Sequence, residues 1–180
     1  MPRHGYTAGA IALHWAVALM VFALLGLGWY MDDLPEGVAR SASIQLHKSI
    51  GISVFLLMLI RVLWRLSHRP PPLNRVPGWQ IRLARSNHCL MYVLLFVQPL
   101  SGYLSSSFSG YPTQYAGIEL PHWGWRDEAL NDLFSTVHQI NSKVLAALIV
   151  LHILGALTHL LVYRDSVVRR MLPWNGAPRE

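Results

Sequence analysis

The sequence predicts an all-α integral membrane protein, a four-helix bundle with both termini in the cytoplasm. Three observations support this prediction: long charge-free apolar stretches, few charged residues and an uneven distribution of the basic ones. The chain of 180 residues is 53% hydrophobic and 13% charged, whereas soluble domains average about 25% charged residues. We therefore exclude an ordinary water-soluble enzyme and expect one membrane domain over residues 1–180.

Four stretches are long enough to cross a bilayer, which requires about 20 mostly apolar residues. The expected helices cover residues 8–31, 41–66, 86–107 and 135–163. The first carries no charge and is longer than the core of a signal peptide, so we expect it to remain as a helix. The third ends near Ser107, where a Ser/Gly/Pro-rich loop begins, and Pro99 is expected to kink it.

The basic residues predict the orientation of these helices. Eleven of the fifteen lie on one side of the membrane: Arg3, Arg61, Arg65, Arg69, Arg75, Arg82, Arg85, Arg164, Arg169, Arg170 and Arg179. The other side holds four basic residues and seven of the nine acidic residues. Because cytoplasmic loops are enriched in Lys and Arg, both termini are expected in the cytoplasm. The net charge of +6 is thereby explained, and no nucleic-acid partner is expected.

Four histidines occupy two depths in the predicted bundle. His47 and His138 lie near the outer ends of the second and fourth helices, and His14 and His152 lie in the cytoplasmic halves of the first and fourth. Fourteen residues separate His138 from His152, about 21 Å along a helix and close to the same face. Ionisable residues in a membrane are costly and commonly functional. Depth alone therefore predicts the pairs His47–His138 and His14–His152.

Paired imidazoles favour haem over zinc, which collects three or four protein ligands at one point. Since Cys89 is the single cysteine, covalent haem attachment and a four-thiolate iron–sulfur cluster are excluded. Each of the four histidines is followed, four residues on, by a small residue that leaves room for a flat macrocycle: Ala18, Gly51, Ser142 and Ala156. Small residues are also common at membrane helix interfaces, so the sequence alone leaves that explanation open. His4, His68 and His122 lie outside the predicted spans and are expected at the headgroups.

Several motifs along most of the chain resemble the bacterial four-helix cytochrome b561 family of inner-membrane dihaem proteins. These motifs are "ALHW" with His14, "LHKSIG" with His47, "LIRVLWRLSHRPPP", "QPLSGYL", "SSFSGYPTQYAGIELP", "VHQINSK" with His138 and "LHILGALTHLLVYRD" with His152. The resemblance implies that these four histidines bind two b-type haems. It also implies a multi-pass protein of the bacterial inner membrane.

The resemblance further implies an enzyme, a superoxide oxidase that oxidises superoxide at the periplasmic face and reduces ubiquinone. Lys48, Arg126 and Lys143 lie beside the outer histidines and are expected to attract superoxide or to pair with haem propionates; Lys48 could instead simply reach the interface. His159, and after it His88, are the expected quinone-binding residues, with a propionate contact as the alternative role for His159.

Two other functions remain open at this stage. Relatives in the family are haem-carrying subunits of hydrogenases and dehydrogenases, so the chain could pass electrons for a partner protein docked on the outer loop. A proton or metal transporter with histidine relays is the third hypothesis. It predicts a colourless protein, and it does not explain why the histidines come in pairs at two depths.

Overall fold

The computed structural model describes residues 5–68 and 76–172. It contains four long helices, α1 (Ala8–Asp32), α2 (Val38–Ser67), α3 (Gly78–Ser109) and α4 (Glu128–Leu157), and a short antiparallel hairpin, β1 (Thr113–Tyr115) and β2 (Ile118–Leu120). Arg3, His4, Arg69, Arg75 and Arg179, which entered the predictions above, lie outside the described residues.

Each long helix has the length and composition to cross a membrane, so the predicted four-helix membrane bundle is confirmed. Large apolar side chains project outward from the helices; Leu19, Leu66 and Val162 are 67%, 75% and 71% exposed. Such residues are normally buried in a soluble protein, and here they face the position of the lipid chains. The chain is a multi-pass membrane protein.

Two helices begin earlier than their apolar stretches do. α3 starts at Gly78 rather than near residue 86, with Pro77 as its N-cap, and its first turns include charged residues that no hydropathy criterion selects. α4 starts at Glu128 rather than near residue 135, because the Asp127 side chain accepts a hydrogen bond from the Leu130 amide at 3.0 Å. Both extensions are polar helical turns that continue beyond the apolar segment.

The loop after α3 contains the hairpin, which was not predicted. Thr113, Gln114 and Tyr115 pair with Leu120, Glu119 and Ile118. Ala116 and Gly117 form the two-residue turn with φ angles of 50° and 81°, the backbone that hairpin turns of this length favour. Each strand has three residues, so the fold class remains mostly helical.

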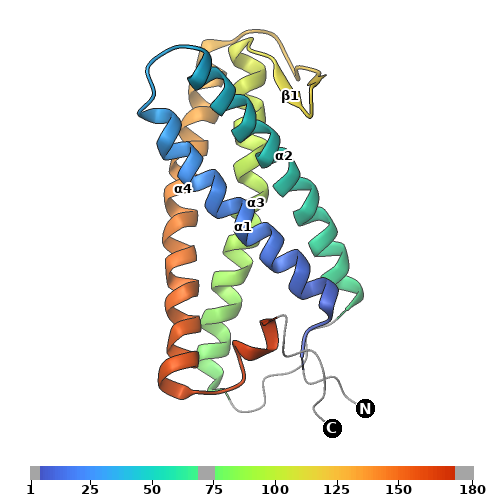
Figure 1. Ribbon diagram of the computed structural model, residues 1–180, viewed down its shortest axis with the longest axis vertical. Coiled ribbons are helices and arrows are strands. Elements are labelled where there is room, and N and C mark those ends of the chain that lie inside the picture. Colours follow the sequence, from blue (N-terminus) through green and yellow to red (C-terminus); the bar gives the residue numbers. More distant parts are fainter. Residues whose placement is uncertain (1–4, 69–75, 173–180) are drawn as a thin grey trace.

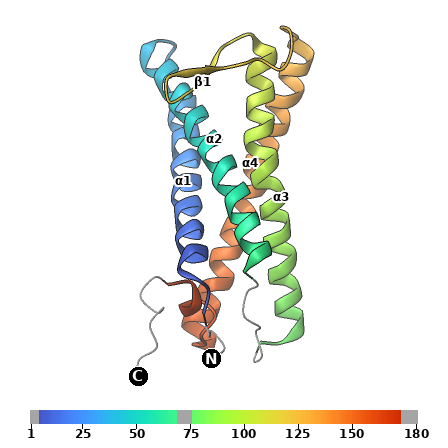
Figure 2. The ribbon, with the colours of Figure 1, turned by 90° about the vertical axis from the view of Figure 1, so that its right-hand side faces the viewer.

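The four helices form two close pairs, α1 with α2 and α3 with α4, joined along α2 and α3 (Figures 1 and 2). We call the end that carries β1 and β2 the hairpin end. At the opposite end the beginning and the end of the described chain meet: the Tyr6 amide bonds the Arg170 carbonyl at 3.5 Å, and Trp15 Nε1 donates to the Met171 carbonyl at 2.9 Å. We call this the terminal end.

An apolar core lies between the two ends. Val17, Val21, Val54 and Met58 are its buried members, contributed by α1 and α2, and side chains of α3 and α4 pack against them. On α1 the core residues follow His14 towards the hairpin end, and on α2 they follow His47 towards the terminal end, so the core separates the two levels at which the predicted histidine pairs occur. The fold therefore places histidines at two levels with an apolar layer between them.

Candidate functional site

At the hairpin end, α2 and α4 bring His47 and His138 together in an edge-to-face arrangement. Their ring centres are 6.2 Å apart and the ring planes cross at 68°. Two metal–imidazole bonds of about 2.0 Å, one on each side of a metal ion, place ring centres about 6 Å apart. The observed separation therefore fits one metal ion held between the two imidazoles.

A cavity of about 580 Å³ adjoins this pair, with walls from all four helices and from β1. Its volume is typical of a site for a large organic ligand. Gly51 and Ser142, two of the small residues predicted to leave room for a macrocycle, line it. Gly102 lines it as well, and a Cβ atom there would lie 3.0 Å from His138 Nδ1, so only glycine lets α3 approach the imidazole this closely.

The ring nitrogens at the hairpin end are held as metal ligands are. His138 Nδ1 donates to the Gln98 carbonyl at 2.9 Å, which leaves Nε2 as the nitrogen with a lone pair. Gln98 Nε2 donates to that nitrogen at 3.0 Å, a hydrogen bond that ligation of iron would replace, and Asn141 in turn donates to the Gln98 side-chain oxygen. His47 Nδ1 is buried and bonds to no group of the described chain. A fixed imidazole opposite an unsatisfied one, beside a large cavity, fits a haem group.

At the terminal end the second pair repeats this spacing. His14 and His152 have ring centres 6.2 Å apart with an interplanar angle of 71°. The Arg61 guanidinium lies 3.3 Å from His14 Nδ1. The ring centre of His88 lies 5.2 Å from that of His152, so His88 adjoins this pair. Ala18 and Ala156, the small residues predicted here, are half-buried.

These histidines form pairs and not a multidentate metal centre. Among the described residues, no group of three or more His, Cys, Asp and Glu side chains is arranged to hold a metal ion. A structural zinc site needs four protein ligands, and a catalytic one needs three and a water. The four predicted histidines are instead brought together two by two, at opposite ends of the bundle.

The basic residues predicted at the outer face occupy different places. Lys48 lines the cavity and donates to Ser106 Oγ at 2.6 Å and to the Pro112 carbonyl at 3.3 Å. Lys143 also lines the cavity. Arg126 is not among the cavity residues; its side chain is 74% exposed and lies 3.8 Å from Glu128. Two of the three cations thus adjoin the candidate haem site.

His159 lies in a segment of π-helix, Thr158–Tyr163, that continues α4. The chain then turns through Arg164, which has a positive φ of 51°, and returns the Asp165 carboxylate to within 2.6 Å of His159 Nδ1. Burial raises the pKa of Asp165, but hydrogen bonds from the Val167 amide and from His159 outweigh it and hold this pKa below its ordinary value. π-helical turns are rare and occur frequently at functional sites.

Sequence reasoning missed three partners of the histidines: Gln98 beside His138, Arg61 beside His14 and Asp165 beside His159. Arg61 was interpreted as a marker of topology alone. Gln98 precedes Pro99 and had no separate signal. Asp165 follows His159 at a spacing that no ordinary α-helix brings together, so the π-helical turn was needed to find it.

A membrane bundle whose helices present facing histidine pairs at two levels has the architecture of a membrane-embedded electron-transfer cytochrome. The family model described as prokaryotic cytochrome b561 matches residues 5–174. The chain is 34% identical over 171 residues to "Cytochrome b561 homolog 2" of Escherichia coli (strain K12), covering 93% of this chain and 90% of that protein. It is 29% identical over 172 residues to "Probable superoxide oxidase CybB" of Yersinia pestis, covering 93% and 96%.

The chain therefore belongs to the prokaryotic cytochrome b561 family. Members of this family bind b-type haem and transfer electrons in membranes, and this chain is an oxidoreductase-type cytochrome. The predicted family is confirmed. The histidine-based transporter is not supported, because family membership makes electron transfer the function of the bundle.

Proposed function

We propose that the protein carries electrons across the bilayer through two haem b groups. His47 and His138 would ligate one at the hairpin end, and His14 and His152 would ligate the other at the terminal end. The observation that carries this proposal is the identical ring separation of 6.2 Å in two pairs at opposite ends of the bundle. When bound, each haem supplies one-electron transfer between its ferric and ferrous states.

The polypeptide orients the ligands and keeps the space between them dry. The bond from His138 Nδ1 to the Gln98 carbonyl sets the tautomer and the ring orientation. The core of Val17, Val21, Val54 and Met58 excludes water between the two levels. Electrons can then cross the membrane while protons remain on their own side.

The orientation follows from the basic residues. Four arginines lie in the parts of α2 and α3 nearest the terminal end: Arg61, Arg65, Arg82 and Arg85. The described acidic residues other than Asp165 lie in segments near the hairpin end. The positive-inside rule therefore supports a terminal end in the cytoplasm and a hairpin end in the periplasm of a bacterial inner membrane.

We propose superoxide as the electron donor at the hairpin end. Two superoxide ions would each lose one electron and leave as oxygen, and the two electrons with two protons would convert one ubiquinone to its quinol. Lys48 and Lys143 line the cavity there and supply positive charge beside it. The name of the Yersinia relative, a probable superoxide oxidase, supports this donor.

The quinone would bind at the terminal end beside His159. Asp165 accepts a hydrogen bond from His159 Nδ1, so the other ring nitrogen, when it also carries a proton, would donate to a quinone oxygen and transfer that proton to it. His159 is seven residues from His152, two helical turns further towards this end. His88 is the weaker candidate, because its ring adjoins His152 and not the His159–Asp165 pair.

The experiment is a visible spectrum of the purified protein under a flux of superoxide, with superoxide dismutase as control and dithionite to define full reduction. We expect reduction that dismutase abolishes, and reoxidation on addition of ubiquinone. His47→Ala should lose one of two haems by pyridine haemochromogen assay, whereas His68→Ala, which changes a histidine stacked on Trp64, should retain both.

Three results would contradict the proposal at different levels. Two haems reduced by dithionite but not by superoxide would favour the second candidate, a haem subunit for a partner dehydrogenase. The exposed aromatic side chains of Tyr111, Trp123 and Trp125 near the hairpin end would suit such a partner. A full haem complement in His47→Ala would refute the ligand assignment. A protein without haem would refute the mechanism as a whole.

A further inference from the structure

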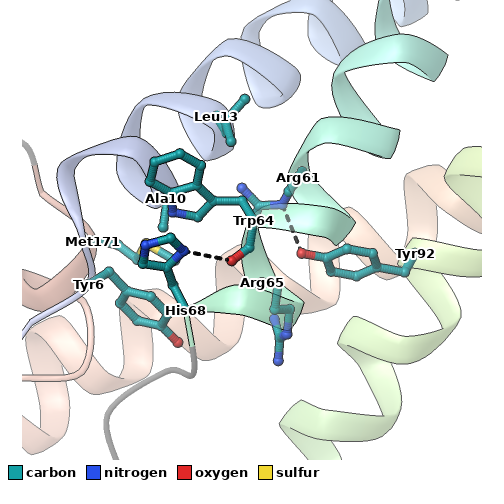
Figure 3. Close-up of a pocket in the computed structure, with 9 residues that line it drawn as sticks. All are labelled: Tyr6, Ala10, Leu13, Arg61, Trp64, Arg65, His68, Tyr92 and Met171. Atoms are coloured by element: carbon teal, nitrogen blue, oxygen red, sulfur yellow. Dashed lines mark hydrogen bonds between the residues drawn. The ribbon is translucent and has the colours of Figure 1, made fainter.

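Two arginines of α2 flank one tyrosine of α3 at the terminal end (Figure 3). Arg61 Nε donates to the Tyr92 hydroxyl at 2.9 Å. The guanidinium carbons of Arg61 and Arg65 lie 5.7 Å and 5.6 Å from the centre of the Tyr92 ring. These three side chains and Trp64 border a small pocket of about 30 Å³. Two cations thus share one aromatic ring near the end of α2, where Arg61 is half-buried and Arg65 is exposed.

Neither arginine has an anionic partner among the described residues. The two ion pairs in the described part of the chain are Arg126–Glu128 and His159–Asp165, so the described acid at this end is engaged elsewhere. Partly buried charges in proteins are normally paired. Among the described residues, no carboxylate therefore balances the positive charge of the half-buried Arg61.

Arg61 has two neutral acceptors, the Tyr92 hydroxyl and His14, and His14 is a candidate iron ligand. Arg61 Nη2 lies 3.3 Å from His14 Nδ1, and a guanidinium can only donate, so His14 Nδ1 accepts this bond. A neutral imidazole that binds iron through one nitrogen carries its proton on the other. Whichever nitrogen of His14 binds iron, Nδ1 then has no lone pair left to accept. This step rests on the proposed haem ligation.

We propose that Arg61 and Arg65, with the Tyr92 hydroxyl, form an anion site that binds a propionate carboxylate of the haem at the terminal end. Binding of haem by His14 would take away the Nδ1 lone pair that now accepts from Arg61 at 3.3 Å, and the haem propionates would offer carboxylates as new partners. A guanidinium pairs with a carboxylate through two parallel hydrogen bonds. A phospholipid phosphate has the same chemistry and is the competing occupant.

The test is a redox titration of the intact, haem-loaded protein in nanodiscs of phosphatidylcholine. The variants are Arg61→Gln, Arg61→Lys and Arg65→Gln, and the control is Arg82→Gln, an exposed arginine of α3. A positive charge beside the porphyrin favours the reduced state. We expect Arg61→Gln to lower the midpoint potential of one haem by about 59 mV, a tenfold change for one electron. The other haem should titrate as in the wild type.

Charge retention should rescue the potential. Arg61→Lys should keep most of it, Arg65→Gln should lower the same haem potential by a smaller amount, and Arg82→Gln should change neither haem. Loss of one haem in Arg61→Gln with retention in Arg61→Lys would support the site as well. If Arg61→Gln fails to fold, Arg65→Gln decides.

Repeating the titration on delipidated protein in dodecyl maltoside, a detergent without phosphate, identifies the anion. A shift of equal size in nanodiscs and in detergent supports the propionate. A shift confined to the phospholipid nanodiscs would assign the site to lipid phosphate and overturn the proposal, as would unchanged potentials in Arg61→Gln and Arg65→Gln. If the wild type contains no haem at this end, the proposed function fails, and that is seen before any arginine variant is measured.

Discussion

Substituting Gly102 by alanine gives a quantitative test of the cavity at the hairpin end. The added Cβ would lie 3.0 Å from His138 Nδ1, whereas unstrained contacts are about 3.5–4.0 Å. The imidazole must therefore retreat by about 0.5 Å. Its bond to the Gln98 carbonyl, now 2.9 Å, would lengthen to about 3.4 Å, beyond the normal range.

The expected cost is the sum of two terms. Weakening the hydrogen bond costs about 1 kcal/mol, and overpacking at its mild end costs about 1 kcal/mol more. Together these predict a haem dissociation constant about thirtyfold higher at this site. The haem at the terminal end should be unaffected, because Gly102 lines the cavity beside His138.

The assay follows haem transfer from Gly102→Ala to an excess of apomyoglobin, with the haem-to-protein ratio measured first. Gly26→Ala in α1 is the matched control, since a Cβ there meets no atom within 4 Å. We expect one haem to leave the Gly102 variant faster and both to leave the control at the wild-type rate. Unchanged release of both haems from Gly102→Ala would refute the placement of a haem in this cavity.

Two more predictions concern the ends of the electron path. Lys48→Ala should slow haem reduction by superoxide several-fold at low salt, with a smaller difference at high salt, as followed by stopped-flow absorbance; an equal loss in Arg40→Ala would show that the charge acts without the cavity. Asp165→Asn should raise KM for ubiquinone. Because burial raises the pKa of Asp165 but the Val167 amide and His159 lower it further, the wild-type carboxylate stays charged until the pH falls through that lowered pKa. KM of the wild type should therefore rise only in acid, and equal KM values for the variant and wild type would contradict this role.

The helices could be predicted from the sequence where lipid contact alone determines them. Long apolar runs have one explanation, so α1 and the apolar parts of the other helices were found. The starts of α3 and α4 were missed by several residues because those turns are polar and continue into water. The hairpin was missed because three-residue strands carry too little alternation to be distinguished from a loop.

The candidate site, like the helices, could be predicted from the sequence only in part. Histidines are conspicuous inside apolar stretches because burial of an ionisable group is costly, and helical rise assigns each one a depth. Depth does not give rotation or the register between helices. That is why His88, assigned a depth similar to that of His159, was expected beside the quinone, whereas the structure packs its ring 5.2 Å from that of His152.

The residues that contact the histidines each have a common explanation when the sequence is considered alone, so their role beside a histidine could not be predicted. An arginine near the end of a membrane helix marks topology, a glutamine before a proline has no assigned role, and a glycine in a membrane helix favours packing in general. Each gains a specific meaning only when another helix brings an imidazole to it, as α1 brings His14 to Arg61 and α4 brings His138 to Gln98 and Gly102. The candidate ligands of such a site can thus be predicted from the sequence, whereas the groups that orient them and balance their charge depend on how the helices pack.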